Sequence, residues 1–177
     1  MKFVIIQDGI IWGVGESNES IVERGGFYEA TDRLVEAVKR GVSPAPYRIE
    51  GKVADLDVDL MNKQLQDELA EFCGTEHFYQ AGKLTITDGV KFLVDRAACY
   101  WLLDIIASYQ SQLTREPFQV WELKVSNKRH GVVTADDGNG NKLVRQEIPS
   151  TDFPLDYIKL YCADAGLRRV VMLPNEY

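Results

Sequence analysis

The sequence has few of the residues that build metal centres and disulfide frameworks. Its 177 residues include only 3 cysteines and 2 histidines. The cysteines, Cys73, Cys99 and Cys162, are odd in number and far apart, which argues against a disulfide framework and against the paired thiols of a structural zinc site. With only His77 and His130, a zinc centre with three histidine ligands is excluded. We therefore expect reduced thiols, no metal site and no cofactor.

The sequence also lacks the motifs of common nucleotide-binding and hydrolytic enzymes. It contains no GxGxxG, no GxxxxGKS/T and no GxSxG motif, so the usual dinucleotide, P-loop and nucleophile-elbow sites have no basis here. Its longest uncharged stretch, residues 105–114, is about half as long as a membrane-spanning helix. The apolar run at residues 3–6 is too short for the core of a signal peptide. We therefore expect a cytoplasmic protein with no membrane contact.

What remains is the composition of an ordinary globular protein. Hydrophobic residues make up 45% and charged residues 27% of the chain, which separates it from disordered and low-complexity sequences. Lys and Arg number 20 and Asp and Glu number 27, giving a net charge of -7. This balance disfavours a phosphate-binding surface over the whole molecule. The expected partner is an unidentified protein or small molecule, nucleic acid is not expected, and a homodimer stays open.

The first 57 residues predict a small α+β module. Two apolar runs, at residues 3–6 and 10–14, flank Asp8-Gly9. This pattern predicts a β-hairpin, because Asp and Gly tolerate the positive φ of a type I′ turn. The module is predicted to continue with a helix at residues 17–24, a strand at 27–30, a helix at 31–41 and a strand at 47–54.

Residues 58–61 are expected to link this module to a second α+β domain at residues 62–177. Its main element is a helix at 89–112 with Asp88 as N-cap, which is apolar on nearly all sides and is therefore expected to be buried. The other predicted elements are a helix at 61–72 and strands at 77–79, 84–86, 118–125, 131–135, 142–148, 157–162 and 168–173. Residues 155–162 could also be helical. The predicted fold is an antiparallel sheet that covers one long buried helix.

The strongest site candidates lie on this central helix. Arg96, Tyr100 and Asp104 are spaced by four and form a narrow polar stripe on an otherwise apolar helix. A carboxylate in such surroundings must be paired, protonated or turned toward a cavity. We therefore predict that His77, Arg96, Tyr100 and Asp104 bind a ligand. The alternative is a satisfied polar pair inside the core, with Tyr100 or Arg96 as the partner of Asp104.

Two other patterns suggest chemistry but have simpler explanations. Cys73 and His77 form the only Cys/His neighbourhood, and a nucleophilic thiol would need such a base within hydrogen-bond reach. A buried structural thiol beside an exposed histidine is the alternative, and no catalytic residue is assigned. Asp137, Asn139 and Asn141 match the first, third and fifth positions of a calcium loop, but its glycine and its bidentate glutamate are missing. A hairpin loop explains these residues as well.

Several short motifs occur in one order and carry a family resemblance. They are Phe72-Cys73-Gly74-Thr75-Glu76-His77-Phe78-Tyr79, Thr87-Asp88-Gly89-Val90, Tyr100-Trp101-Leu102-Leu103-Asp104, Phe118-Gln119-Val120-Trp121 and Thr151-Asp152-Phe153-Pro154. Over about residues 65–177 the chain resembles a domain of unknown function found in bacterial, plasmid and phage genomes. The resemblance implies no reaction, cofactor or catalytic residue, and the first 57 residues lie outside it.

Three functions are compatible with these features. The first is an accessory protein of a mobile element that acts as a protein- or small-ligand-binding module. The second is a small-molecule enzyme with a pocket beside the central helix, in which Asp104, Tyr100 and His77 would act; hot-dog and cystatin-like folds cradle a helix in this way, but fold analogy alone assigns no chemistry. The third is a nucleic-acid mimic, which the interleaved positions of acidic and basic residues disfavour.

Overall fold

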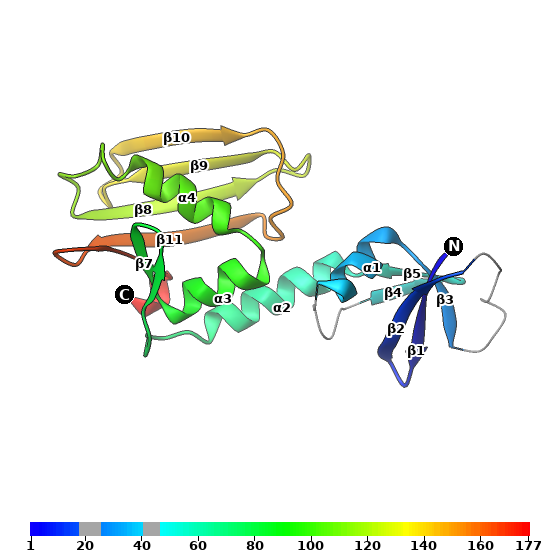
Figure 1. Ribbon diagram of the computed structural model, residues 1–177. Coiled ribbons are helices and arrows are strands. Elements are labelled where there is room, and N and C mark those ends of the chain that lie inside the picture. The colour runs from blue at the N-terminus through cyan, green and yellow to red at the C-terminus, as the bar shows by residue number, and fades with distance from the viewer. Residues whose placement is uncertain (18–25, 41–46) are drawn as a thin grey trace. The chain divides into compact units, whose positions relative to one another are not determined.

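The computed structural model describes residues 1–17, 26–40 and 47–177, and its fold is α+β, as the sequence predicts (Figure 1). The chain forms two compact units, Met1–Gln64 and Leu65–Tyr177. Each unit has its own mixed sheet and its own buried apolar cluster. The helix predicted at residues 17–24 falls outside the described residues.

The N-terminal unit is a five-stranded sheet with the order β2-β1-β3-β5-β4. The predicted hairpin is confirmed, since β1 (Lys2–Gln7) pairs antiparallel with β2 (Ile10–Glu16). Asp8 has φ 51° and Gly9 has φ 76°, the left-handed conformations that a type I′ turn requires. The remaining elements are β3 (Phe27–Ala30), α1 (Asp32–Lys39), β4 (Tyr47–Glu50) and β5 (Val53–Leu56).

Two local features of this unit differ from the sequence prediction or add to it. Residues 47–54 do not form one strand: β4 and β5 make a hairpin that turns at Gly51, where φ is 65°. The alternation continues across this turn, which is why the sequence reads as a single strand. β3 and β5 pair in parallel, and α1 spans the connection between them with Leu34, Val35 and Ala37 buried.

The boundary between the two units falls within one helix. α2 covers Val58–Ala70, so residues 58–61, expected as a linker, form its first turn. The Asp57 side chain caps this turn by accepting a hydrogen bond from the Leu60 amide at 3.0 Å. Val58 and Met61 pack on the N-terminal cluster, whereas Leu65 and Leu69 belong to the C-terminal core.

The C-terminal unit contains a seven-stranded sheet with the order β10-β9-β8-β11-β12-β7-β6. It is mixed rather than antiparallel, because β12 pairs with β7 in parallel. Residues 155–162 are not helical, since most of them lie in β11. The strands are β6 (Tyr79–Ala81), β7 (Leu84–Ile86), β8 (Phe118–Val125), β9 (Gly131–Asp136), β10 (Lys142–Ile148), β11 (Tyr157–Asp164) and β12 (Arg169–Met172).

The prediction of one long central helix is wrong. Residues 89–112 contain two helices, α3 (Asp88–Arg96) and α4 (Tyr100–Tyr109). Between them Ala98 adopts φ 49°, and the Cys99 amide bonds to the Val94 carbonyl at 3.1 Å, one residue beyond the helical partner. Alanine favours helix and disfavours this left-handed conformation, so the sequence contains no local signal for the break.

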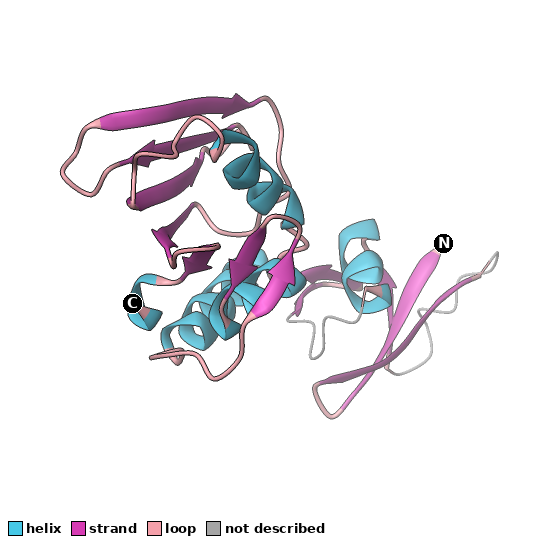
Figure 2. Ribbon diagram, turned by 60° about the vertical axis from the view of Figure 1, so that its left-hand side comes forward, coloured by secondary structure: helices cyan, strands magenta, loops and turns pink. Residues whose placement is uncertain are grey.

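The core of this unit lies between the sheet and its helices (Figure 2). From α4, Leu102, Leu103 and Ile106 are buried, and Trp121 of β8 is 1% exposed. The Trp121 indole donates to the Gln119 side-chain oxygen at 2.9 Å, which satisfies its only polar atom. Among the described residues, no helix has the length and apolar character needed to cross a membrane.

Candidate functional site

An open groove of about 880 Å³ lies on the C-terminal unit. Its walls are the chain that follows α2, the start of β6 and one side of α3. The charged and titratable side chains that line it are Glu71, Cys73, Glu76, His77, Asp88, Lys91 and Asp95. Phe72, Tyr79 and Phe92 add aromatic surface, and the rings of Phe72 and Phe92 lie 5.4 Å apart.

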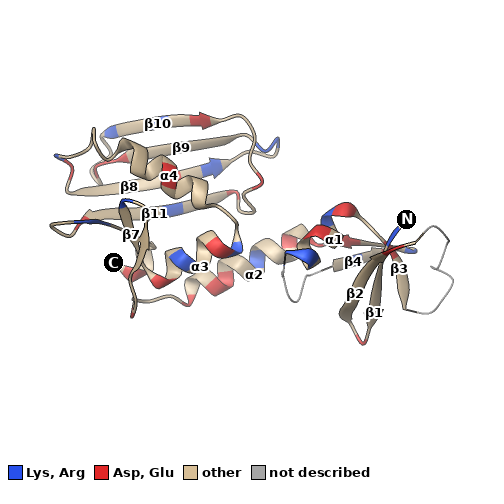
Figure 3. Cartoon of the chain, viewed as in Figure 1, with Lys and Arg blue, Asp and Glu red and all other residues tan. Residues whose placement is uncertain are grey.

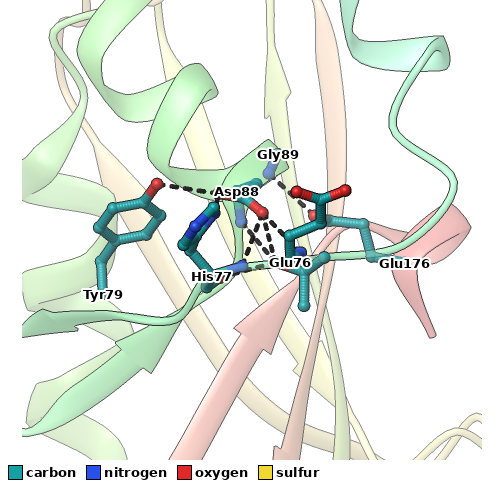
Figure 4. A network of polar contacts seen from close by, with 7 residues as sticks. Glu76, His77, Tyr79, Asp88, Gly89 and Glu176 are labelled. Carbon is teal, nitrogen blue, oxygen red and sulfur yellow. Dashed lines mark hydrogen bonds and ion pairs between the residues drawn. The ribbon is translucent and has the colours of Figure 1, made fainter.

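The Asp88 carboxylate organises the loop on one side of this groove (Figure 4). Its Oδ2 accepts hydrogen bonds from the Glu76 amide at 2.8 Å and the His77 amide at 2.9 Å. The Thr75 hydroxyl lies 3.0 Å from the same oxygen and 2.9 Å from the Asp88 amide. The Tyr79 hydroxyl donates to Oδ1 at 2.9 Å. One carboxylate therefore holds the chain from residue 75 to residue 79.

These donors also determine the charge of Asp88. The hydrogen bond from the His77 amide, followed by those from Glu76, Tyr79 and Thr75, lowers the Asp88 pKa well below its usual range despite partial burial. The same interaction raises the pKa of the Tyr79 hydroxyl, because that hydroxyl donates to an anion. Asp88 is also the first residue of α3, where a negative charge is favourable.

A second carboxylate, from Glu176, binds the same helix start (Figure 4). Glu176 lies in η1 (Pro174–Glu176) and accepts hydrogen bonds from the Gly89 amide at 2.8 Å, the Leu173 amide at 2.9 Å and the Thr87 hydroxyl at 2.5 Å. A Cβ at position 89 would lie only 2.5 Å from Leu173 Cδ1 and 2.9 Å from Glu176 Oε2. A side chain at position 89 would therefore displace the ends of the Leu173 and Glu176 side chains.

Further along α3, an ion pair places fixed charges at the groove. Lys91 contacts the Asp95 carboxylate, and the Tyr100 hydroxyl donates to its other oxygen at 2.6 Å. Despite partial burial, these hydrogen bonds lower the pKa of Asp95. They raise the pKa values of Lys91 and Tyr100, both chiefly through the hydrogen bond to Asp95. Both signs of charge are visible on α3 in Figure 3.

The part of the chain that carries this site matches a known family. Residues 63–177 match a family of unknown function, DUF6876. The chain belongs to this family. The resemblance expected over residues 65–177 is thus confirmed as far as a domain of unknown function, and the match conveys nothing about bacterial, plasmid or phage origin. No curated protein and no solved structure matches the chain.

The DUF6876 domain does not bring the four predicted ligand-binding residues together. His77 lines the groove, with Nδ1 3.6 Å from Asp88 Oδ1. Arg96 pairs with Glu68 at 3.7 Å, and Tyr100 bonds to Asp95 instead of Asp104. The break after α3 interrupts the four-residue spacing on which the predicted stripe depends.

Asp104 itself differs most from its expected environment. Its side chain is exposed on α4, so the expectation of a carboxylate held inside the core or a cavity is wrong. A helix can be apolar overall and still turn a single position to solvent, which the composition of α4 does not reveal. A ligand-binding role for Asp104, Arg96, Tyr100 and His77 remains a prediction.

Cys73 and His77, the predicted Cys/His neighbourhood, both line the groove. Cys73 is exposed and follows the carboxyl end of α2, with Glu71 and Glu76 close by in the chain. Within the described residues, no hydrogen bond joins Cys73 to His77.

The Asp137 loop satisfies its own polar groups. Asp137 accepts hydrogen bonds from the Asn139 amide at 2.8 Å and the Asn141 amide at 3.1 Å, and Asn141 Nδ2 lies 2.7 Å from its second oxygen. This arrangement is that of the hairpin loop between β9 and β10. In the described part of the chain, no group of three or more His, Cys, Asp or Glu side chains could hold a metal ion.

Sequence reasoning missed most of the residues that build the groove. The sequence predicts Asp88 as the N-cap of a helix or as one of several candidate carboxylates, whereas the N-cap is Thr87 and Asp88 is the first residue of α3. Lys91 and Asp95 receive no role although their spacing of four is a standard helical ion-pair signal. The contact of Glu176 with α3 carries no local signal, because Thr87 and Gly89 lie more than eighty residues earlier.

Proposed function

We propose that the DUF6876 domain is a binding module whose groove takes a cationic ligand. The observation that supports this function is the fixed negative charge of the groove. Its lining contains four carboxylates, Glu71, Glu76, Asp88 and Asp95, against the single ammonium of Lys91. Clefts lined by one sign of charge raise the local concentration of ligands of the other sign.

The direction of the pKa shifts favours binding over acid–base catalysis. A general acid or base works best with a pKa near the working pH. Here the pKa values of the acids Asp88 and Asp95 are lowered, and those of Lys91, Tyr79 and Tyr100 are raised. Each group is thus held in one protonation state around neutral pH. The alternative of a small-molecule enzyme gains no support from these groups.

Two carboxylates are available to a ligand. Glu71 and Glu76 are exposed, and neither has a hydrogen-bond or ion-pair partner for its side chain among the described residues. Lys91 illustrates how the groove accommodates an ammonium group: its Nζ contacts Asp95 and lies 5.9 Å from the centre of the Tyr79 ring. Carboxylate and aromatic surface together favour an ammonium or guanidinium group.

The proposal includes a role as an accessory protein. A cation-binding module suits an accessory protein that acts through a partner or a small ligand, and a mobile-element setting would rest on the family resemblance alone. The expected cytoplasmic location and a possible homodimer are independent of the groove.

The direct test is titration of the full chain with n-butylammonium, followed by the shifts of backbone amide resonances. We expect the shifts to concentrate at residues 71–79 and 88–95, and n-butyrate to produce none there. Replacing both free carboxylates, Glu71→Gln with Glu76→Gln, should weaken binding by about fivefold, because each exposed charge pair contributes modestly. Added salt should weaken it as well.

Asp104→Asn is the matched control, since it removes an exposed carboxylate outside the groove lining. Its affinity for n-butylammonium should equal that of the parent chain. Equal binding of butyrate, or a loss in Asp104→Asn as large as in the double variant, would contradict the groove as the cation site. The second result would instead support the stripe predicted from the sequence.

A further inference from the structure

The groove adjoins an edge of the seven-stranded sheet. Among the strands of the described residues, β6 is the last in the order and pairs only with β7. Its hairpin turns through two residues, the first of which is Gly82 with φ 58°, as in a type II′ turn. In such a hairpin the pair next to the turn, here Ala81 and Leu84, exchanges backbone hydrogen bonds.

The direction of the free backbone groups follows from this register. Because hydrogen-bonded and non-hydrogen-bonded pairs alternate along an antiparallel ladder, Gln80 and Thr85 form a non-hydrogen-bonded pair. The N–H and C=O groups of Gln80 therefore point away from β7, toward the open edge. Phe78, two residues earlier and just before β6, has a side chain that is 60% exposed. An extended chain can add to such an edge by backbone hydrogen bonding.

We infer that the cation bound by the groove is a lysine or arginine side chain of an extended polypeptide that adds a strand to β6. The inference rests on the proposed cation-binding groove and specifies its partner. Tyr79 points to the groove, since its hydroxyl bonds to Asp88. Side chains of an added strand that lie opposite Tyr79 share that face. The residue opposite Gln80 points to the other face, beside exposed Phe78.

This geometry defines the chemistry of the partner. Basic residues at alternate positions would reach the acidic groove, and apolar residues between them would lie on the Phe78 face. A second copy of this chain does not fit, because residues 78–81 carry no cation and two paired copies would bring two acidic grooves together. The charge of the groove thus selects a basic partner.

The test compares a synthetic peptide of alternating lysine and valine with one of alternating glutamate and valine, both titrated into the full chain. The lysine peptide should bind more tightly than n-butylammonium, and the glutamate peptide should not bind. N-methylation of the valine amides should weaken the lysine peptide about tenfold, because in an antiparallel pairing it removes the N–H that donates to the Gln80 carbonyl without changing charge.

A variant of β6 gives the reciprocal measurement. Gln80→Pro removes the outward N–H while leaving the ladder to β7 intact, since proline is tolerated on edge strands. It should weaken the lysine peptide about tenfold and leave n-butylammonium binding unchanged. Gln80→Ala is the control: it loses the same side-chain bonds, to Gly82 and from Arg168, and keeps the N–H.

The outcomes separate the two proposals. If neither Gln80→Pro nor N-methylation affects peptide binding, the strand is not involved, although the cation-binding groove stands. If neither the peptide nor n-butylammonium binds, both proposals fail. A dimer seen by light scattering that Gln80→Pro dissociates would assign this edge to a second copy and overturn the basic partner.

Discussion

Two loops of the C-terminal unit are each built around one aspartate, and they differ in where the donors to that aspartate come from. Asp137 is bonded by Asn139 and Asn141, two and four residues away. Asp88 is bonded by the amides of Glu76 and His77, twelve and eleven residues away. The first loop closes on itself, whereas the second ties residues 75–79 to the start of α3.

The different origin of the donors means that the Asp137 loop is a local turn, whereas the hydrogen bonds to Asp88 are tertiary contacts. Asparagine and glycine allow the Asp137 loop to form wherever the hairpin does. The hydrogen bonds to Asp88, the Asp88 clamp, form only when residues 75–79 lie against the start of α3, so they report on the packed domain. Both carboxylates have lowered pKa values, that of Asp137 to about 2 through Asn141 first and then the Asn139 amide. A low pKa alone therefore does not distinguish the two roles.

The largest effect is expected when each carboxylate is replaced by an amide. Asp88→Asn leaves one neutral acceptor oxygen for a set of donors that includes two backbone amides from a segment eleven and twelve residues away, and hydrogen bonds to a charged acceptor contribute more than those to a neutral one. Asp137→Asn affects a solvated loop. We expect the fall in melting temperature to be several times larger for Asp88→Asn. Equal falls in melting temperature would show that the hydrogen bonds to Asp88 stabilise the domain no more than those to Asp137.

Acid provides a second readout of the same comparison. A carboxylate whose folded pKa lies below its unfolded value binds more protons when unfolded, so its stabilisation is complete above the unfolded pKa and is lost as the pH falls through the folded pKa. For Asp137 this loss runs from pH 3.8 to about 2. For Asp88 it extends lower. In urea titrations, the difference between parent and Asp88→Asn should therefore persist to lower pH than that between parent and Asp137→Asn.

The same contrast explains how much the sequence could predict. The Asp8-Gly9 hairpin and the Asp137 loop were predictable, because their geometry depends on adjacent residues that tolerate positive φ. The alternating strands β8, β9 and β10 were also predictable, since period-two burial is visible in the chain. A pattern in neighbouring residues cannot show a hydrogen-bond or strand-pairing partner that is distant in the sequence.

The missed features all depend on such partners. The left-handed Ala98 that ends α3 is held by tertiary structure against the helix preference of alanine. The parallel pairing of β12 with β7 joins segments about eighty residues apart. Of the predicted ligand residues, only His77 lines the groove, because the apolar pattern pointed to a continuous helix.

A smaller effect is expected at the helix start that the clamp fixes. A Cβ at position 89 would meet Leu173 and Glu176, whose carboxylate is held by three hydrogen bonds. Gly89→Ala should therefore lower the free energy of unfolding by about 1–3 kcal/mol, the usual cost of overpacking. Gly74→Ala is the control, since its Cβ would meet nothing within 4 Å. Similar urea midpoints for the two variants would show that the contact between η1 and α3 is not needed.

The smallest effect is expected for the imidazole of His77. Its backbone amide is a donor to Asp88, but its ring is 69% exposed and lies 3.6 Å from that carboxylate. His77→Ala keeps the amide and removes only the ring, so the free energy of unfolding at neutral pH should change by no more than about 0.5 kcal/mol. His77→Pro, which removes the amide donor, should resemble Asp88→Asn. If His77→Ala were instead as destabilising as Asp88→Asn, the residue 75–79 segment would be held by the His77–Asp88 ion pair. The backbone hydrogen bonds to Asp88 would then not be what distinguishes this segment from the Asp137 loop.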